Sequence, residues 1–150
     1  KISLAYATKY KTRKLVLIAS PYKQNITKPT FKMKVYKAVK KIPGLKGLES
    51  FVKKHVGSTD YRNASETMRK ILVNHVNLDL TEEVKKIKCP TLLIWGTNDE
   101  AVSINDAIEL EKIIPNCGLV KYEGCTHYAY LENLGQTIRV LDNFIRSDKE

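Results

Sequence analysis

The sequence predicts an α/β protein in which three parallel strands are flanked by helices and a helical segment is inserted between two of the strands. Two continuous apolar runs, 14–20 (KLVLIAS) and 91–96 (TLLIWG), are typical of strands buried on both faces. Helix and strand patterns then alternate over 88–146, as parallel sheets require. The stretch 22–86 has helical patterns only and is too long for a plain crossover between strands.

The first elements are a helix end and a buried strand. Residues 1–10 (KISLAYATKY) have the pattern of a helix that is finishing, and the run 14–20 follows it and stops at Pro21. The side chains that we expect the helix to turn inward are Ile2, Leu4, Ala5 and Ala7.

The last elements alternate regularly. After the strand at 91–96, a helix is predicted over 103–114, opened by Ser103 with Asp106 three residues later, which is a capping signature. A weaker strand follows at 118–123 (GLVKYE). A final helix is predicted over 134–146, with one apolar face formed by Leu134, Ile138, Leu141 and Ile145.

The segment between the first two strands departs from this alternation. Its predicted helices cover 29–41, 45–55 and 64–76, the third capped by Asn63 with Glu66, and a short helix follows Thr81. We therefore expect a core made of residues 1–21 and 87–150, and a helical insertion of the lid type over 22–86.

The charge is unevenly distributed. The chain of 150 residues has a formal net charge of +10, yet residues 1–55 hold 15 basic residues and a single acid, Glu49. Lysines far outnumber arginines, and no arginine cluster suggests base or phosphate recognition. The pattern favours a solvated lysine-rich surface over nucleic-acid binding, so we expect no nucleic-acid partner.

The apolar runs and the cysteines bear on location. The longest apolar run, 15–19, is far shorter than the roughly 20 residues of a membrane helix, and no secretory signal is visible. The three cysteines form no C-x-x-C pair, and their odd number in a chain without a signal indicates reduced thiols. Cys117, Cys125 and His127 match no standard zinc spacing. We expect a cytoplasmic protein without a metal site or a membrane contact. Since the chain opens on Lys1 rather than Met, we also expect that a segment has been removed or that the chain is a piece of a longer protein.

Two polar residues follow neighbouring predicted strands. Asp99 lies just after the strand at 91–96, and His127 lies in the loop after the strand at 118–123. Ligands of parallel sheets bind outside the carboxyl ends of the strands. There, an acid can orient an imidazole so that its other nitrogen acts as a general base. Taken singly, such an aspartate is more often a turn or helix cap, and such a histidine a surface residue.

Longer motifs make the pattern specific. The segments 88–99 (KCPTLLIWGTND), 113–116 (IIPN) and 122–127 (YEGCTH), with Leu131 and Glu132, resemble the C-terminal part of an α/β-hydrolase, in the lid-bearing esterase and C–C hydrolase-like branch. Residues 1–21 resemble the helix after the nucleophile and the next strand. The resemblance implies that Asp99 is the triad acid and His127 the triad histidine. Thr126 stands where the family usually has glycine.

The nucleophile of such a triad is missing. No G-x-S-x-G motif occurs, and the resemblance puts the nucleophile just before Lys1. Ser3 lies inside the predicted helix without flanking glycines, and Pro21 forbids a nucleophile elbow at Ser20. We expect a fragment of a serine hydrolase that cleaves an ester or an activated C–C bond of a small molecule through an acyl-enzyme, inactive alone. The alternative is a non-catalytic protein that binds a small ligand on a hydrolase scaffold.

The remaining candidates have more ordinary interpretations. Tyr128 and Tyr130 flank His127 and are candidates for lining a substrate pocket or for packing. Glu132 is expected to cap the final helix, Cys89 and Cys125 to be small buried residues, and His55, His75 and Glu100 to be surface or packing residues. No metal or organic cofactor is implied.

The resemblance also predicts a partner. In this fold the strand at 14–20 pairs on one side with the nucleophile strand, which this sequence lacks. Its apolar edge would be open to another chain. We expect that edge to bind the missing N-terminal half or to form a homodimer.

Overall fold

A computed structural model describes residues 1–24 and 59–147 of the chain. The chain divides into two compact units, Lys1–Lys23 with Asp79–Glu150, and Gln24–Leu78. The helices expected over 29–41 and 45–55 lie outside the described residues. Within the described part of the chain, no helix is long and apolar enough to cross a membrane.

The first unit is built on a parallel sheet of three strands in the order β1-β2-β3. The strands are β1 (Leu15–Ile18), β2 (Thr91–Gly96) and β3 (Cys117–Tyr122). Every residue of the central strand β2 is buried, which explains why its sequence is continuously apolar. The predicted α/β class and the parallel sheet are therefore confirmed.

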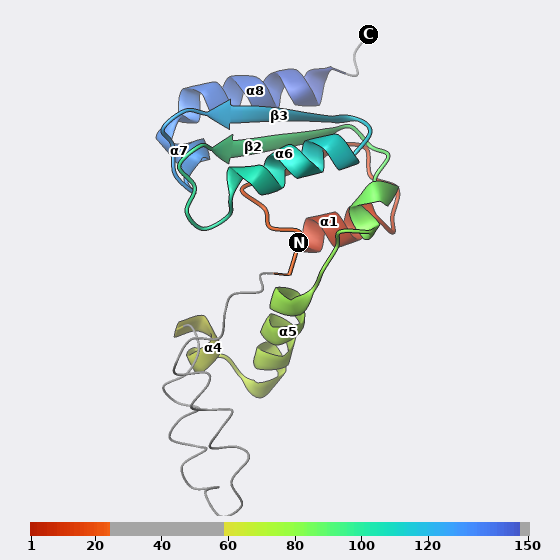
Figure 1. Ribbon diagram of the computed structural model, residues 1–150, viewed down its shortest axis with the longest axis vertical. Helices are drawn as coiled ribbons and strands as arrows, with labels where there is room; N and C mark the ends of the chain where they lie inside the picture. The colour runs from red at the N-terminus through yellow and green to blue at the C-terminus, as the bar shows by residue number, and fades with distance from the viewer. Residues whose placement is uncertain (25–58, 148–150) are drawn as a thin grey trace, which may run out of the picture. The chain divides into compact units, whose positions relative to one another are not determined.

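Helices cover both faces of this sheet (Figure 1). On one face lie α1 (Ile2–Ala7), the 3-10 helix η1 (Glu83–Lys86) and α6 (Ile104–Ile113). On the other lie the short α7 (Ala129–Glu132) and α8 (Leu134–Arg146). Figure 1 shows that β2 and β3 point toward α7, so the carboxyl ends of the strands meet at that side of the unit.

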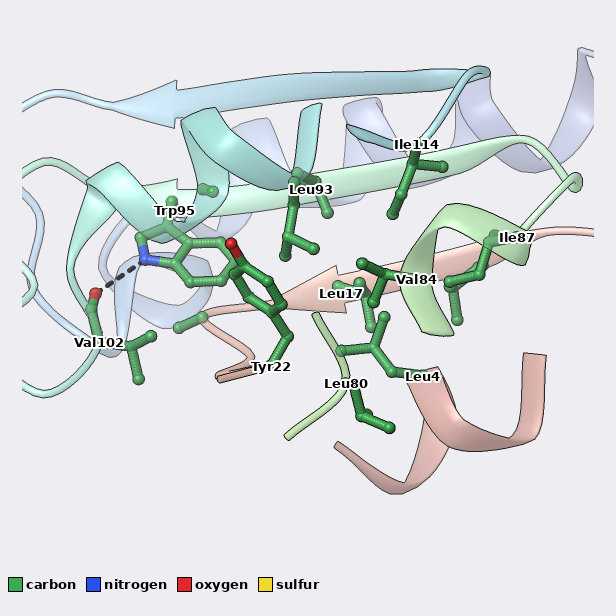
Figure 2. Packing of buried hydrophobic residues seen from close by; sticks show 14 of the residues in the cluster. Leu4, Leu17, Tyr22, Leu80, Val84, Ile87, Leu93, Trp95, Val102 and Ile114 are labelled. Carbon is green, nitrogen blue, oxygen red and sulfur yellow. Dashed lines mark hydrogen bonds between the residues drawn. The ribbon is translucent and has the colours of Figure 1, made fainter. Parts of the chain in front are cut away.

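The larger core lies on the α6 face of the sheet (Figure 2). Leu93 and Trp95 of β2 are fully buried there. Tyr22, Leu80 and Val84 pack into the same cluster, and the backbone N–H of Leu80 donates to the carbonyl of Tyr22 at 3.0 Å. These contacts explain why the boundaries of the two units fall at 23 and 79 rather than at the expected 21 and 87. That the second unit acts as a lid remains a prediction.

The inner faces of two helices differ from those expected. Ile2 of α1 is exposed, whereas Leu4 is fully buried. In α8, the expected inner face is largely on the surface: Leu134, Ile138 and Ile145 are 51%, 58% and 62% exposed. The residues of α8 that pack on the sheet side are Thr137, Val140, Leu141 and Phe144. The apolar arc of α8 is thus wider than one stripe, and residues 1–24 and 59–147 cover only one side of it.

Side chains cap the N-termini of α6 and of a helix in the second unit, and one of these caps differs from the expected one. Ser103 caps α6, and its Oγ accepts from the N–H of Asn105 at 3.2 Å. The second unit contains α4 (Thr59–Asn63) and α5 (Glu66–Asn77). The N-cap of α5 is Ser65, which accepts from the N–H of Met68, and not the expected Asn63. The two candidate caps are two residues apart in the sequence, and α4 occupies the first of them.

The burial of β2 predicts a steep cost for shortening its side chains. Leu93→Ala leaves a cavity in the fully buried cluster and is expected to lower the free energy of unfolding by about 2–5 kcal/mol. Leu131→Ala removes the same atoms from a side chain that is 57% exposed, and it should change the free energy of unfolding by less than about 0.5 kcal/mol. Urea unfolding of both variants measures the difference. Equal effects would contradict the assignment of Leu93 to the core.

Candidate active site

Asp99 lies in the turn that follows β2, and its carboxyl group is held by the backbone. Its Oδ1 accepts from the N–H groups of Ala101 and Val102, each at 2.8 Å. The indole N–H of Trp95 donates to the carbonyl of Val102 at 2.9 Å and fixes this turn on the core, as Figure 2 shows. Two oriented amides are strong donors to a carboxylate. By binding Oδ1 they fix the orientation of the carboxyl group and so the direction in which Oδ2 points.

That second oxygen meets the predicted histidine. Oδ2 of Asp99 lies 2.8 Å from Nδ1 of His127, although the two residues are 28 positions apart in the chain. The carboxyl side chain is fully buried, whereas the imidazole side chain is 39% exposed. A carboxylate only accepts, so a hydrogen bond from the imidazole to it takes the tautomer with the proton on Nδ1, in which Nε2 is the basic nitrogen. The expected proximity of the two side chains is thus found in the structure, and their catalytic role remains a prediction.

Backbone and side-chain bonds join the two loops that carry this pair. The N–H of Asn98 donates to the carbonyl of Cys125 at 2.9 Å, and its amide side chain lies 3.4 Å from the carbonyl of Gly124. The N–H of Gly124 donates to Oγ1 of Thr97 at 2.9 Å. Gly124 has a φ of +72°, a conformation that glycine adopts without strain. The two loops therefore form one hydrogen-bonded surface.

Gly96 allows this close approach at the end of β2. A Cβ atom added there would lie 2.2 Å from the carbonyl oxygen of Cys125 and 2.3 Å from that of Thr126. Both oxygens belong to the backbone, so neither can move aside without moving the loop before His127. The glycine of the W-G-x-x-D motif is therefore required by the close approach of the histidine loop.

Glu132 anchors the same loop and does not cap α8, contrary to expectation. The N–H of Thr126 donates to its Oε2 at 2.8 Å, and the hydroxyl of Thr126 donates to its Oε1. These bonds hold the pKa of Glu132 below its ordinary value of 4.5. A group with a lowered pKa stabilises the fold above its unfolded pKa, and the stabilisation is lost as the pH falls through the folded value. The anchor is therefore intact at neutral pH.

Other expected residues take varied positions. Tyr128 is exposed and meets the imidazole of His127 edge-on, with ring centroids 5.6 Å apart, and Tyr130 is half-buried. Cys89 is buried, and Cys125 is half-buried, where burial and then the nearby Glu132 raise the pKa of its thiol. Residues of smaller consequence are Glu100, which is exposed, His75, which is half-buried in α5, and His55, which lies outside the described residues.

The described residues bring together no group of three histidine, cysteine, aspartate or glutamate side chains that could hold a metal ion. The residues that sequence reasoning missed are the ones that support the pair: Gly96, Thr97, Asn98 and the acceptor role of Glu132. All four lie in segments that the resemblance covers, but the contacts that they make depend on which loops meet in space.

Comparisons with known proteins agree with this architecture. No protein-family model matches the sequence. A metagenomic α/β hydrolase, MGS-M2 from the Medee basin, superimposes over 96% of this chain and 60% of its own, with a TM-score of 0.62 and 18% identity. The chain has an α/β-hydrolase fold. The meta-cleavage product hydrolase CumD of Pseudomonas fluorescens shares this fold over 98% of the chain and 61% of its own, with a TM-score of 0.64 and 15% identity.

Sequence relatives with the α/β-hydrolase fold are enzymes. Human monoacylglycerol lipase ABHD6 is 34% identical over 68 residues, which are 45% of this chain and 20% of the lipase. A 2-hydroxy-6-oxononadienedioate/2-hydroxy-6-oxononatrienedioate hydrolase of Pseudomonas putida is 31% identical over 68 residues, 45% of this chain and 24% of its own length. The aligned segment thus spans about a fifth to a quarter of these curated relatives.

The close approach at Gly96 predicts the effect of a single methyl group. Gly96→Ala is expected to push the histidine loop away, to abolish the protected Nδ1 proton of His127 and to lower the free energy of unfolding by about 1–3 kcal/mol. Gly118→Ala, where an added Cβ meets nothing within 4 Å, is the matched control and should leave the proton in place. Proton NMR of the imidazole distinguishes the two. An unchanged Nδ1 signal in Gly96→Ala would sink this account of the motif.

Proposed function

We propose that the chain is part of a serine hydrolase, in which Asp99 and His127 are the acid and the base of a catalytic triad. The observation that carries the proposal is the 2.8 Å contact between His127 Nδ1 and the buried carboxyl group of Asp99. Its position supports the proposal further, because both residues follow the carboxyl ends of adjacent parallel strands, in the acid-then-histidine order of this fold.

The chemistry follows from the geometry of the pair. Nε2 of His127 takes the proton of a serine hydroxyl as the serine attacks the substrate carbonyl, and later returns it to the leaving group. Asp99 holds the imidazole in the required tautomer and stabilises the imidazolium that forms. The names of the relatives, a monoacylglycerol lipase and a 2-hydroxy-6-oxo-dienedioate hydrolase, support an ester or an activated C–C bond in a small molecule as the substrate. The reaction requires no metal or organic cofactor.

We further propose that the serine belongs to polypeptide that precedes Lys1. The amino nitrogen of Lys1 lies 3.4 Å from Oγ of Ser20, which follows the carboxyl end of β1. A residue immediately upstream would therefore lie at the same edge of the sheet as Asp99 and His127. Within the chain, Ser3 is exposed on α1 and has no flanking glycines.

This assignment predicts that the 150-residue chain is inactive by itself. Without a nucleophile and an oxyanion hole, it lacks the groups that account for most of the acceleration in acyl transfer. Hydrolysis of p-nitrophenyl butyrate should equal the uncatalysed rate, and adding the upstream part of the protein should restore turnover. In the restored protein, His127→Ala should reduce kcat by about 10⁴-fold or more, whereas Glu123→Ala, an exposed acid of the same loop, should not.

Two results would contradict the proposal. One is turnover by the chain alone that His127→Ala abolishes, since the nucleophile would then lie within these residues. The other is a restored protein that binds a small ligand and never turns it over, which would favour the non-catalytic binding protein.

The partner expected at the first strand has support in the sheet edges. Among the described residues, β1 pairs with β2 alone, so the alternating backbone groups of Val16 and Ile18 point away from the sheet. At the opposite edge, the N–H of Leu119 in β3 is occupied by the carboxyl group of Glu111 at 3.0 Å. One outward N–H at the β3 edge therefore has a side-chain partner, whereas the described residues show no such partner at β1.

The exposed side of α8 extends this open edge. Val16 and Ile18 are half-buried and lie on the α8 face of the sheet, and α8 adds an exposed apolar stripe formed by Leu134, Ile138 and Ile145. About two fifths of the solved α/β hydrolases has no counterpart in this chain. We propose that a strand and helix from this missing part cover β1 and the α8 stripe.

The proposed cover predicts the behaviour of the isolated chain. By light scattering it should self-associate through the open edge, and the upstream part of the protein should convert it to a one-to-one complex. Ile138→Glu places a charge in the apolar stripe and should weaken that complex about tenfold or more, whereas Arg139→Ala on the neighbouring exposed position should not. A stable monomer with no affinity for the upstream part would refute the cover, and a tight dimer unaffected by that part would favour a homodimer.

A further inference from the structure

The loop that presents His127 is anchored immediately before the imidazole. Both carboxylate oxygens of Glu132 accept from one residue, Thr126: Oε2 from its N–H at 2.8 Å and Oε1 from its hydroxyl. A bidentate contact fixes direction as well as distance. Thr126 directly precedes His127, so the direction of the imidazole depends on the backbone that Glu132 holds.

The anchor also closes a short ring of the chain. The carbonyl of Thr126 accepts from the N–H of Ala129 at 3.1 Å, and the N–H of Glu132 donates to the carbonyl of Tyr128 at 3.0 Å. Ala129 is buried against the sheet and holds α7 in place. The carboxyl group at the end of α7 therefore reaches back over one turn to the residue before His127 and ties the loop to the helix.

On the other side of the loop the support comes from the acid turn. Asn98 holds the carbonyl of Cys125, and Thr97 holds the N–H of Gly124. Asp99, in the same turn, contacts the imidazole itself. The acid turn thus fixes residues 124 and 125, and Glu132 supplies the anchor for residue 126.

We propose that Glu132 is a positioning residue, which holds the imidazole of His127 toward Asp99 by binding the amide and the hydroxyl of Thr126. The inference rests on the pair assigned in the proposed function, and it adds a second carboxyl group, which acts through Thr126 without touching the reacting atoms. The threonine is part of the device, because a glycine at that position would keep the amide bond and lose the hydroxyl bond.

The test measures the orientation of the imidazole without any catalysis. In the ¹⁵N-histidine-labelled 150-residue chain at pH 7 and 25 °C, the solvent exchange rate of the His127 Nδ1 proton reports how long its bond to Asp99 persists. Glu132→Ala should raise that rate by about tenfold or more, since a bond to a charged acceptor is lost. Thr126→Ala should raise the exchange rate by a smaller factor, and Thr126→Ser, which keeps the hydroxyl, should give the exchange rate of the unsubstituted chain. Glu123→Ala, the exposed acid of the same loop, is the control and should leave it unchanged.

Further comparisons separate positioning from stability. In the double variant Glu132→Ala with Thr126→Ala, the rate should equal that of Glu132→Ala alone, because both changes break one link. A lower Tm with an unchanged exchange rate at 25 °C would mean a purely structural role and overturn the proposal, as would additive effects. Thr126→Ala tests the link without altering Glu132, so the outcome does not depend on one variant folding.

The result is independent of the proposed reaction. A restored protein without hydrolase activity, but with an Nδ1 proton that responds to Glu132, would refute the proposed function and support the positioning role. A protein that hydrolyses esters and whose Nδ1 exchange rate is unchanged by Glu132→Ala would support the proposed function and refute the positioning role. Absence of a protected Nδ1 proton in the unsubstituted chain would overturn the positioning role, since no oriented imidazole would then exist.

Discussion

The buried carboxyl group of Asp99 is the constraint on which the arrangement at the strand ends depends. A carboxylate removed from water is costly unless hydrogen bonds replace its hydration, and this one has two amides on one oxygen and the imidazole of His127 on the other. The amides require the turn that Trp95 ties to the core, and the imidazole requires a loop that passes over Gly96. Core packing, turn and loop are thus coupled through one charged group.

The elements that the sequence predicted well are those whose own residues determine them. The apolar run at 91–96 is continuous because both faces of β2 are covered, and the final helix over 134–146 has the predicted bounds. The proximity of Asp99 and His127 was also predictable, because parallel strands bring their carboxyl ends to one edge. Local pattern and topology were sufficient for both.

What escaped prediction depends on partners that periodicity does not identify. The spacing of Leu134, Ile138 and Ile145 predicts an apolar stripe on α8. It does not show that the sheet packs against the neighbouring side of the helix and leaves these three residues exposed. Glu132 was expected to cap the final helix, yet its place at the end of α7 brings its carboxyl group back to Thr126. Ser65 displaced Asn63 as a cap because α4 ends at the asparagine. In each case several nearby residues could fill one role, and only the packing of the folded chain decides which of them does.

The unequal edges of the sheet limit how copies of this unit can aggregate. A sheet with two open edges can add strands at both ends and grow into a fibre. Here Glu111 occupies the N–H of Leu119 on one outer strand, whereas β1 has no such cover among the described residues. Two units that paired through β1 would each have used that edge, and a further strand could pair at Leu119 of β3 only by displacing Glu111. A carboxylate of α6 thereby opposes strand addition at one position of the β3 edge.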